Sequence, residues 1–400
     1  MKIVFVADHC CIRLFKESSV LLDRGHEMHL VSFERGTGHN FYKSFLGYWY
    51  FKDKNTLKIQ HKNQFQEAIR HYCEYIKPDL FVCHNEPDWI CEETIKVAHP
   101  LGIPVVWDIH DIESARQGQI PLEEQRIMQM IDGIVHVSEY AKKWTNWVHS
   151  YLKCPQEVIY SMYPSPEGIK NREDIRKVLP VPSVYPLVAP KIHNSLVYEG
   201  GIGAPEEKQE MIKSGNAKVL SFNMRNYAGI FEQFSNEGFK PFIYGAGAPI
   251  GECNKDAMKY MKYGCVTQPS IDPLNLIYEL AKYEFGFVGF PVMGTPLFDM
   301  AFPNKFCDYM MAGVIPIVVN CKQTGELVAD NKLGFYFPDL KMIKEPDVLR
   351  KILNCNRSEY QARIVEWRKT LYMENQIERL EKLYTDAIAY AKTKLEKEAT

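Results

Sequence analysis

The chain has 400 residues, with 48 Lys and Arg against 50 Asp and Glu and a net charge of -2 at pH 7. At roughly 100–200 residues per domain, this length predicts two or three domains. Hydrophobic residues make up 46% of the chain, which excludes a disordered protein and a small disulfide-stapled scaffold. The balanced charge excludes the chain-wide basic field that drives non-specific nucleic-acid binding.

The cysteine pattern and the apolar segments indicate the cellular compartment of the protein. The eleven cysteines are odd in number and form no C-x-x-C pair, which argues against a structural zinc site and a complete disulfide framework. The apolar run 3–7 is too short for the core of a signal peptide, and no window approaches the ~20 apolar residues of a membrane span. We expect a cytoplasmic protein.

Short apolar runs alternate with helix-like stretches from the start of the chain. The helix candidates are 12–24 and 89–98. The strand candidates are 2–7, 27–33, 79–83, 104–109 and 133–137. Continuous apolar strands separated by helices predict a parallel sheet covered on both faces, and therefore a Rossmann-like α/β domain over residues 1–170.

Six prolines between residues 161 and 190 interrupt this pattern and indicate a linker. The strand candidates after it are 195–198, 218–222, 241–244, 285–289 and 315–319. They predict a second Rossmann-like domain over 190–372, followed by a long helix over 373–400 that crosses back to the first domain. Two such domains would face each other across a cleft, where ligands of open parallel sheets usually bind.

The most informative segment is the run P-N-K-x-x-D-Y-M-x-A-G-x-x-P-I-V-V over residues 303–319. A helix beginning near Asn304 would offer free backbone N–H groups and its positive dipole end to an anion, and Lys305 would add charge. One turn further, the Asp308 carboxylate could accept both hydroxyls of a ribose. A plain surface helix packed on a strand is the alternative interpretation.

This run, with T-G-E-L-V over 324–328, resembles the donor-site helix of GT-B glycosyltransferases. Three more segments resemble the same group in the same chain order: V-V-W-D-I-H-D over 105–111, D-G-I-V-H-V-S-E over 132–139 and L-V-Y-E-G-G over 196–201. The resemblance implies two Rossmann-like domains facing across a cleft. The first would bind the acceptor, and the second would bind a nucleoside-diphosphate sugar, most commonly UDP- or GDP-linked.

The resemblance also implies a set of donor-binding residues at the carboxyl ends of the second sheet. They are Gly200, Gly201, Arg225, Tyr244, Gly245, Asn304, Lys305, Asp308 and the Thr324-Gly325-Glu326 loop. Within this set Asp308 would bind the ribose, and the other residues would surround the diphosphate and the sugar. The chain departs from the family at Met300, where a Glu is usual, although Asp299 is adjacent.

His110 and Asp111 are the catalytic candidates. His110 could hydrogen-bond the donor sugar in a retaining enzyme, whereas His110 or Asp111 could take the acceptor proton in an inverting one. Asp108, His110, Asp111 and Glu113 are also possible metal ligands. Strand alternation, however, sends Asp111 to the face opposite Asp108 and His110, and GT-B enzymes as a class neutralise the leaving diphosphate without an obligatory cation. We expect no metal and no obligatory cofactor.

The segment 41–51, from Phe41 to Phe51, contains seven aromatic residues, with lysines within and beyond it. It could contact an anionic lipid surface, line a site for a hydrophobic acceptor, or be a buried strand or hairpin. Stacking on a nucleic-acid acceptor is a further alternative. One expectation from this segment is that the protein contacts a membrane peripherally.

The sequence thus predicts a hexosyltransferase that uses a nucleotide sugar, with retention of the anomeric configuration preferred over inversion. The acceptor is open among a glycan, a lipid-linked sugar, a protein and a nucleic acid. A nucleotide-sugar epimerase of the same architecture and a catalytically degenerate sugar-nucleotide-binding protein are the alternatives.

Overall fold

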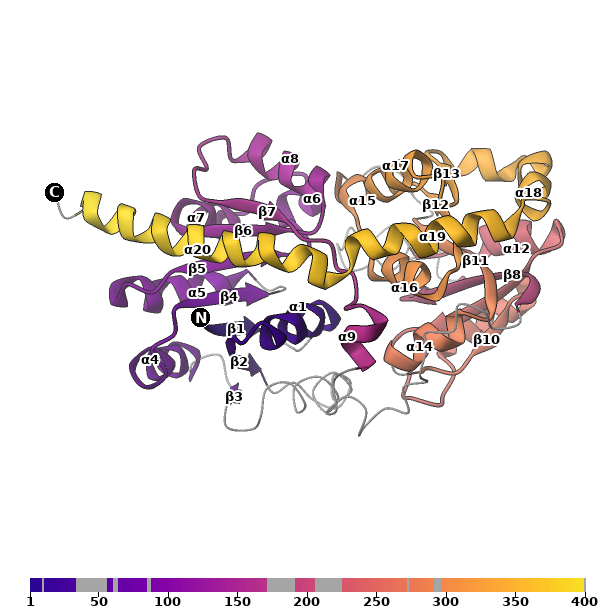
Figure 1. Cartoon of the computed structure of the whole chain (residues 1–400). Helices are drawn as coiled ribbons and strands as arrows, with labels where there is room; N and C mark the ends of the chain where they lie inside the picture. The colour runs from indigo at the N-terminus through magenta and orange to yellow at the C-terminus, as the bar shows by residue number, and fades with distance from the viewer. Residues whose placement is uncertain are drawn as a thin grey trace. The chain divides into compact units, whose positions relative to one another are not determined.

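The computed structural model describes residues 1–8, 11–33, 56–59, 64–84, 88–170, 191–205, 225–271, 273–290 and 296–398. The contacts divide the chain into two compact units. One consists chiefly of Met1–Ile175 and Leu371–Thr400, and the other chiefly of Arg176–Gly294 and Phe298–Thr370. Each unit contains a parallel sheet with helices packed on it (Figure 1), so the predicted pair of Rossmann-like α/β domains is confirmed.

The first unit is built on a parallel sheet of seven described strands in the order β3-β2-β1-β4-β5-β6-β7. The strands are β1 (Lys2–Ala7), β2 (Glu27–Phe33), β3 (Thr56–Ile59), β4 (Leu80–His84), β5 (Val105–Ile109), β6 (Gly133–His136) and β7 (Gln156–Val158). The helices are α1 (Ile12–Asp23), α4 (Phe65–Tyr75), α5 (Trp89–Ala98), α6 (Glu113–Gln117), α7 (Leu122–Met130), α8 (Glu139–Val148), α9 (Pro166–Lys170) and α20 (Met373–Glu398), with a 3-10 turn at His99–Leu101.

The second unit has a parallel sheet of six described strands in the order β10-β9-β8-β11-β12-β13. The strands are β8 (Ile192–Gly200), β9 (Lys240–Gly245), β10 (Val266–Gln268), β11 (Tyr283–Gly289), β12 (Ile315–Val319) and β13 (Phe335–Phe337). The helices are α12 (Ala228–Asn236), α13 (Lys255–Met258), α14 (Pro273–Leu280), α15 (Pro296–Met300), α16 (Asn304–Ala312), α17 (Lys322–Asp330), α18 (Pro346–Leu353) and α19 (Arg357–Leu371), with 3-10 turns at Lys259–Tyr263 and Leu340–Lys344.

Several inner strands of both sheets are buried along their whole length, as a sheet covered on both faces requires. Every residue of β4, β5 and β6 is buried in the first unit, and every residue of β11 and β12 in the second. Two predictions lie outside the described residues: the strand at 218–222 and the aromatic segment 41–51. In the described parts of the chain, no helix is long and apolar enough to cross a bilayer.

The C-terminal helix α20 completes the first unit rather than the second. It runs along that unit's sheet (Figure 1), with Leu380, Leu383 and Tyr384 buried. Gln376, also buried, accepts a hydrogen bond from the backbone N–H of Tyr160 (2.8 Å) and donates one to the carbonyl of Tyr160 (3.1 Å). Because this single amide satisfies two backbone groups, it fixes the beginning of α20 against the segment that follows β7.

The burial of His136 in β6 should make the first unit acid-labile. Burial lowers the pKa of His136 to about 4, so the folded state keeps the ring neutral when the unfolded chain, with an ordinary pKa near 6.5, takes up a proton. Stability is therefore complete above pH 6.5 and falls as the pH approaches 4. Linkage predicts a loss of about 2 kcal/mol between pH 7 and pH 5 from this residue.

The measurement is the free energy of unfolding in urea at several pH values, for the wild type and for His136→Gln. The variant should lose less stability on acidification than the wild type does. Parallel pH dependences of the two proteins would contradict the assignment.

Candidate functional site

In the second unit, the loop after β8 and the start of α16 meet around Lys305. The Lys305 ammonium lies 4.2 Å from the centre of the Tyr198 ring, a cation–π distance. Gly200 has φ +118°, and a Cβ at this position would lie 3.5 Å from the Lys305 Nζ. A Cβ at Gly201 would overlap the Arg225 guanidinium. The structure thus brings together four residues of the predicted set: Gly200, Gly201, Arg225 and Lys305.

The charges around Lys305 suit the binding of an anion. Burial lowers the pKa of Lys305 to about 8; the carboxylate of Glu199 opposes the shift, and the guanidinium of Arg225 adds to it. A negatively charged ligand beside Lys305 and Arg225 would favour the charged ammonium. Glu199 was not predicted as a site residue, although its position at the end of an apolar strand, just before two glycines, is a signal in the sequence.

Asp308 lies one helical turn after Lys305 and is 7% exposed. Its Oδ1 atom is buried and has no hydrogen-bond partner among the described residues. Helix α16 begins after Pro303, which provides no side-chain cap, and Asn304 at its first position is exposed. A buried carboxylate oxygen without a donor costs free energy unless a ligand or water supplies one. The start of α16 therefore offers a carboxylate acceptor close to the positive end of the helix dipole.

Met300 and Asp299 occupy the last turn of α15. Met300 is buried, whereas Asp299 is exposed to solvent. The Asp299 side chain therefore does not take the interior position next to it. At the position where the family usually has a Glu, the structure therefore has a buried methionine side chain, that of Met300.

Tyr244 and Gly245 have structural partners at the end of β9. The Tyr244 hydroxyl is 3.0 Å from the Tyr283 hydroxyl at the start of β11. A Cβ at Gly245 would meet Asn254, whose side chain caps α13 and donates to the Ala246 carbonyl. The structure does not bring the Tyr244 side chain to the group around Lys305.

The prediction that Thr324, Gly325 and Glu326 form a loop is wrong, because all three lie in helix α17. The Gly325 N–H donates to the Cys321 carbonyl (2.8 Å), which starts the helical ladder. The Thr324 hydroxyl is buried and donates to the Ala301 carbonyl (2.7 Å), while the Glu326 carboxylate is 3.9 Å from the Lys322 ammonium. Thr324 thus fixes the chain before α16.

Gly325 has a packing role that is open to test. A Cβ there would overlap the Tyr336 ring of β13, so Gly325→Ala should lower the free energy of unfolding of the second unit by about 1–3 kcal/mol. Chemical denaturation measures the change. Gly229→Ala in α12 is the matched control, because a Cβ at Gly229 has no atom within 4 Å. Equal stability of the two variants would contradict the role.

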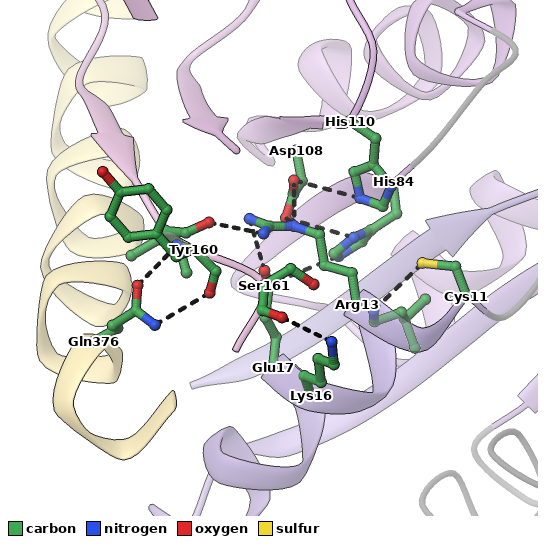
Figure 2. Close-up of polar contacts among 12 residues, drawn as sticks. Cys11, Arg13, Lys16, Glu17, His84, Asp108, His110, Tyr160, Ser161 and Gln376 are labelled. Atoms are coloured by element: carbon green, nitrogen blue, oxygen red, sulfur yellow. Dashed lines mark hydrogen bonds and ion pairs between the residues drawn. The ribbon is translucent and has the colours of Figure 1, made fainter. Parts of the chain in front are cut away.

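In the first unit, the predicted residue His110 borders a buried polar cluster (Figure 2). The β4–β5 register places His84 beside Asp108, and strand alternation puts His110 on the same side. The Arg13 Nε of α1 donates to both oxygens of Asp108 at 3.0 Å, and its Nη1 donates to the Ile159 carbonyl at 2.7 Å. Arg13 Nη2 pairs with Glu17 at 2.9 Å.

The electrostatics of this cluster follow from its burial. Burial alone would raise the pKa of Asp108, but the charges of Arg13, His84 and His110 and the hydrogen bonds from Arg13 together outweigh it and hold that pKa below its usual range. Burial lowers the pKa of His84 to about 4 and raises that of Glu17 well above its ordinary value. Sequence inspection missed Arg13, Glu17 and His84. The signal available for the first two was a pair of opposite charges four residues apart within one helix candidate.

The two catalytic candidates have different surroundings. The His110 Nε2 atom lies 3.5 Å from Asp108 Oδ1, and the side chain is 20% exposed. Asp111 is exposed and pairs with Arg116 (2.9 Å), which also pairs with Glu113 (2.5 Å). Asp111 and Glu113 therefore do not join Asp108 and His110 as a four-ligand metal set. Instead, one ligand atom each from His84, Asp108 and His110 lie within 4.8 Å of one another.

Comparison with known proteins finds no matching family model and no matching curated protein. Solved structures do match over nearly the whole chain. Anabaena HepE in complex with UDP is 11% identical, with a TM-score of 0.55 and 100% of both chains covered. Sucrose-phosphate synthase from Thermosynechococcus elongatus is 11% identical, with a TM-score of 0.61 and coverage of 97% of this chain and 100% of that one.

A third matching structure is a Listeria monocytogenes protein assigned as a UDP-N-acetylglucosamine 2-epimerase. It is 11% identical, with a TM-score of 0.54 and 94% of each chain covered. At such identities the likeness shows the fold alone. Together with the two parallel sheets, it shows that the chain has the GT-B fold of two Rossmann-like domains.

Proposed function

We propose that this protein is a glycosyltransferase that moves a hexosyl group from a nucleoside-diphosphate sugar to an acceptor, with retention of the anomeric configuration. The observation that carries the proposal is the buried Asp308 Oδ1, which has no hydrogen-bond donor among the described residues and lies one turn from Lys305. A ribose diol supplies the donors that this carboxylate needs. The complex of Anabaena HepE with UDP supports a uridine nucleotide as the first donor to test, with GDP-linked sugars second.

The residues around Lys305 would bind the diphosphate. Lys305 and Arg225 provide positive charge, and Gly200 and Gly201 leave the backbone after β8 free of Cβ atoms. During transfer, negative charge develops on the departing nucleoside diphosphate, and cations already in place stabilise it without reorganisation. These groups need no metal ion or cofactor for that task.

His110 would act on the sugar side of the reaction. Its ring is partly exposed, while its Nε2 atom faces the Asp108 carboxylate. A histidine held in this way can hydrogen-bond a sugar hydroxyl in a retaining reaction. Asp111, the alternative base for an inverting reaction, is paired with Arg116. That ion pair favours retention.

The acceptor in this proposal is a glycan, a lipid-linked sugar, a protein or a nucleic acid. A nucleotide-sugar epimerase is the second candidate, supported by the Listeria match. Turnover separates the two, because an epimerase converts the nucleotide sugar without an acceptor. A degenerate binding protein, suggested by Met300, would bind the donor and give no turnover with any acceptor.

The first prediction from this proposal concerns nucleotide affinity. A charge-assisted hydrogen bond contributes roughly 1.5–3 kcal/mol, so Asp308→Asn should weaken binding of the nucleoside diphosphate by about 10- to 100-fold. Thermal shift with UDP- and GDP-linked sugars selects the ligand, and calorimetry gives its affinity. Asp330→Asn, an exposed residue of α17, is the control. Unchanged affinity in Asp308→Asn would reject the ribose assignment.

The second prediction concerns His110. His110→Ala should lower the turnover number by more than it weakens donor binding, because its interaction would strengthen in the transition state. Single-turnover kinetics and calorimetry with the selected donor measure the two quantities. His193→Ala, at a side chain that is 76% exposed, serves as the control. Wild-type kinetics in His110→Ala would contradict this role and leave His110 as a structural residue.

A further inference from the structure

The cluster beside His110 contains a polar side chain with no satisfied hydrogen bond. His84 is fully buried, and neither of its ring nitrogens has a hydrogen-bond partner among the described residues. Both nitrogens nevertheless face carboxylates: Nδ1 is 3.6 Å from Asp108 Oδ2, and Nε2 is 3.9 Å from Glu17 Oε2. These separations are too long for hydrogen bonds. A buried imidazole left in this state requires an explanation such as an ion or a water molecule.

We propose that His84, Asp108 and His110 form a binding site for a divalent transition-metal ion, with Zn²⁺ as the best fit. Two imidazoles and one carboxylate are ligands that Zn²⁺ accepts. The three side chains come from adjacent strands of one sheet and from the residue that follows one of them, so their backbone positions are fixed (Figure 2). The inference goes beyond the proposed transferase and does not depend on it.

The distances fit a bound ion better than they fit direct contacts. Ligand atoms about 2.1 Å from a tetrahedral metal are about 3.4 Å from each other. The separations found are 3.6 Å for His84 Nδ1 to Asp108 Oδ2 and 3.5 Å for His110 Nε2 to Asp108 Oδ1, so the two imidazoles face different oxygens of one carboxylate. One ligand atom from each of the three residues lies within 4.8 Å of the other two.

The surrounding groups match those that usually support metal ligands. A metal-binding histidine commonly donates its second N–H to a carboxylate, and Glu17 faces the second nitrogen of His84. A metal-binding carboxylate is itself hydrogen-bonded, and Arg13 donates to both oxygens of Asp108. Phe5 packs against the His84 ring, with 4.5 Å between the ring centres, and provides an apolar wall.

Charge balance points the same way. Two buried carboxylates, Asp108 and Glu17, face one buried guanidinium, that of Arg13. With both carboxylates ionised the cluster can accept one further positive charge, which either a proton on Glu17 or a metal ion can supply. His110 is the most exposed of the three ligands and gives the ion its route from solvent.

A metal at this site would also fix the tautomer of the His110 ring. Coordination through Nε2 places the ring proton on Nδ1, because a neutral imidazole carries only one proton. The Nδ1 atom would then donate a hydrogen bond and could not accept one. Metal occupancy would thereby prevent His110 from acting as a base while leaving it able to bind a sugar hydroxyl.

The test uses the full chain after removal of bound metal with a chelator. Co²⁺ serves as the spectroscopic probe, and Zn²⁺ affinity is measured by competition with a chromophoric chelator. The wild type should bind one equivalent of Zn²⁺ and give a visible Co²⁺ spectrum without the thiolate charge-transfer bands that binding to cysteines would produce. His110→Gln and His84→Gln should each weaken Zn²⁺ binding by at least about 10-fold.

Two matched controls keep the result specific. His136→Gln removes another fully buried histidine, one that is bonded to Gln156 rather than to this cluster. Asp111→Asn removes the neighbouring exposed carboxylate. Both should bind Zn²⁺ as the wild type does. If His84→Gln fails to fold, as judged by circular dichroism, the partly exposed His110→Gln decides the question.

Three results would overturn the proposal. They are the absence of Co²⁺ and Zn²⁺ binding, equal affinity in the wild type and His110→Gln, and a cobalt spectrum dominated by thiolate bands. None of these depends on transfer activity, so they leave the proposed function untouched. Conversely, failure of nucleotide binding would leave the metal assignment standing.

Discussion

The ion pair between Arg13 and Asp108 is the interaction on which the arrangement of the first unit depends. A single guanidinium joins helix α1 to strand β5, to Glu17 and to the carbonyl of Ile159 beyond β7. All of these groups are buried, so loss of either partner would leave an uncompensated charge in the interior. The pair therefore also fixes the surroundings of His84 and His110.

In the second unit, two cations lie close together at the surface for which we propose binding of an anion. Arg225 rests on Gly201 and Lys305 rests beside Gly200, so the glycines create the space that both side chains occupy. Tyr198 provides an aromatic face for the Lys305 ammonium, and Glu199 provides the opposing charge. The charge of Arg225 and the burial of Lys305 both disfavour the charged ammonium, and perturbed groups of this kind are common at functional sites.

Local pattern predicts some parts of this structure and not others. Asp108 and His110 share a side because residues two apart in a strand always do. His84 joins them only through the register between β4 and β5, which nothing in the local sequence specifies. Arg13 and Glu17 escaped notice because charged residues in an amphipathic helix are expected on its solvent side, whereas α1 is buried on every side.

Thr324–Glu326 shows the opposite error. The family resemblance implied a loop here, yet the missing side chain of Gly325 serves the contact with Tyr336 inside a helix.

Helix α20 has a consequence for biosynthesis. Its residues Leu380, Tyr384 and Ala387 are buried, and the helix packs against α1, β5, β6 and β7. The ribosome must therefore make both units and helix α20 before the first-made unit can close, which reverses the usual N-terminal-first order of co-translational folding.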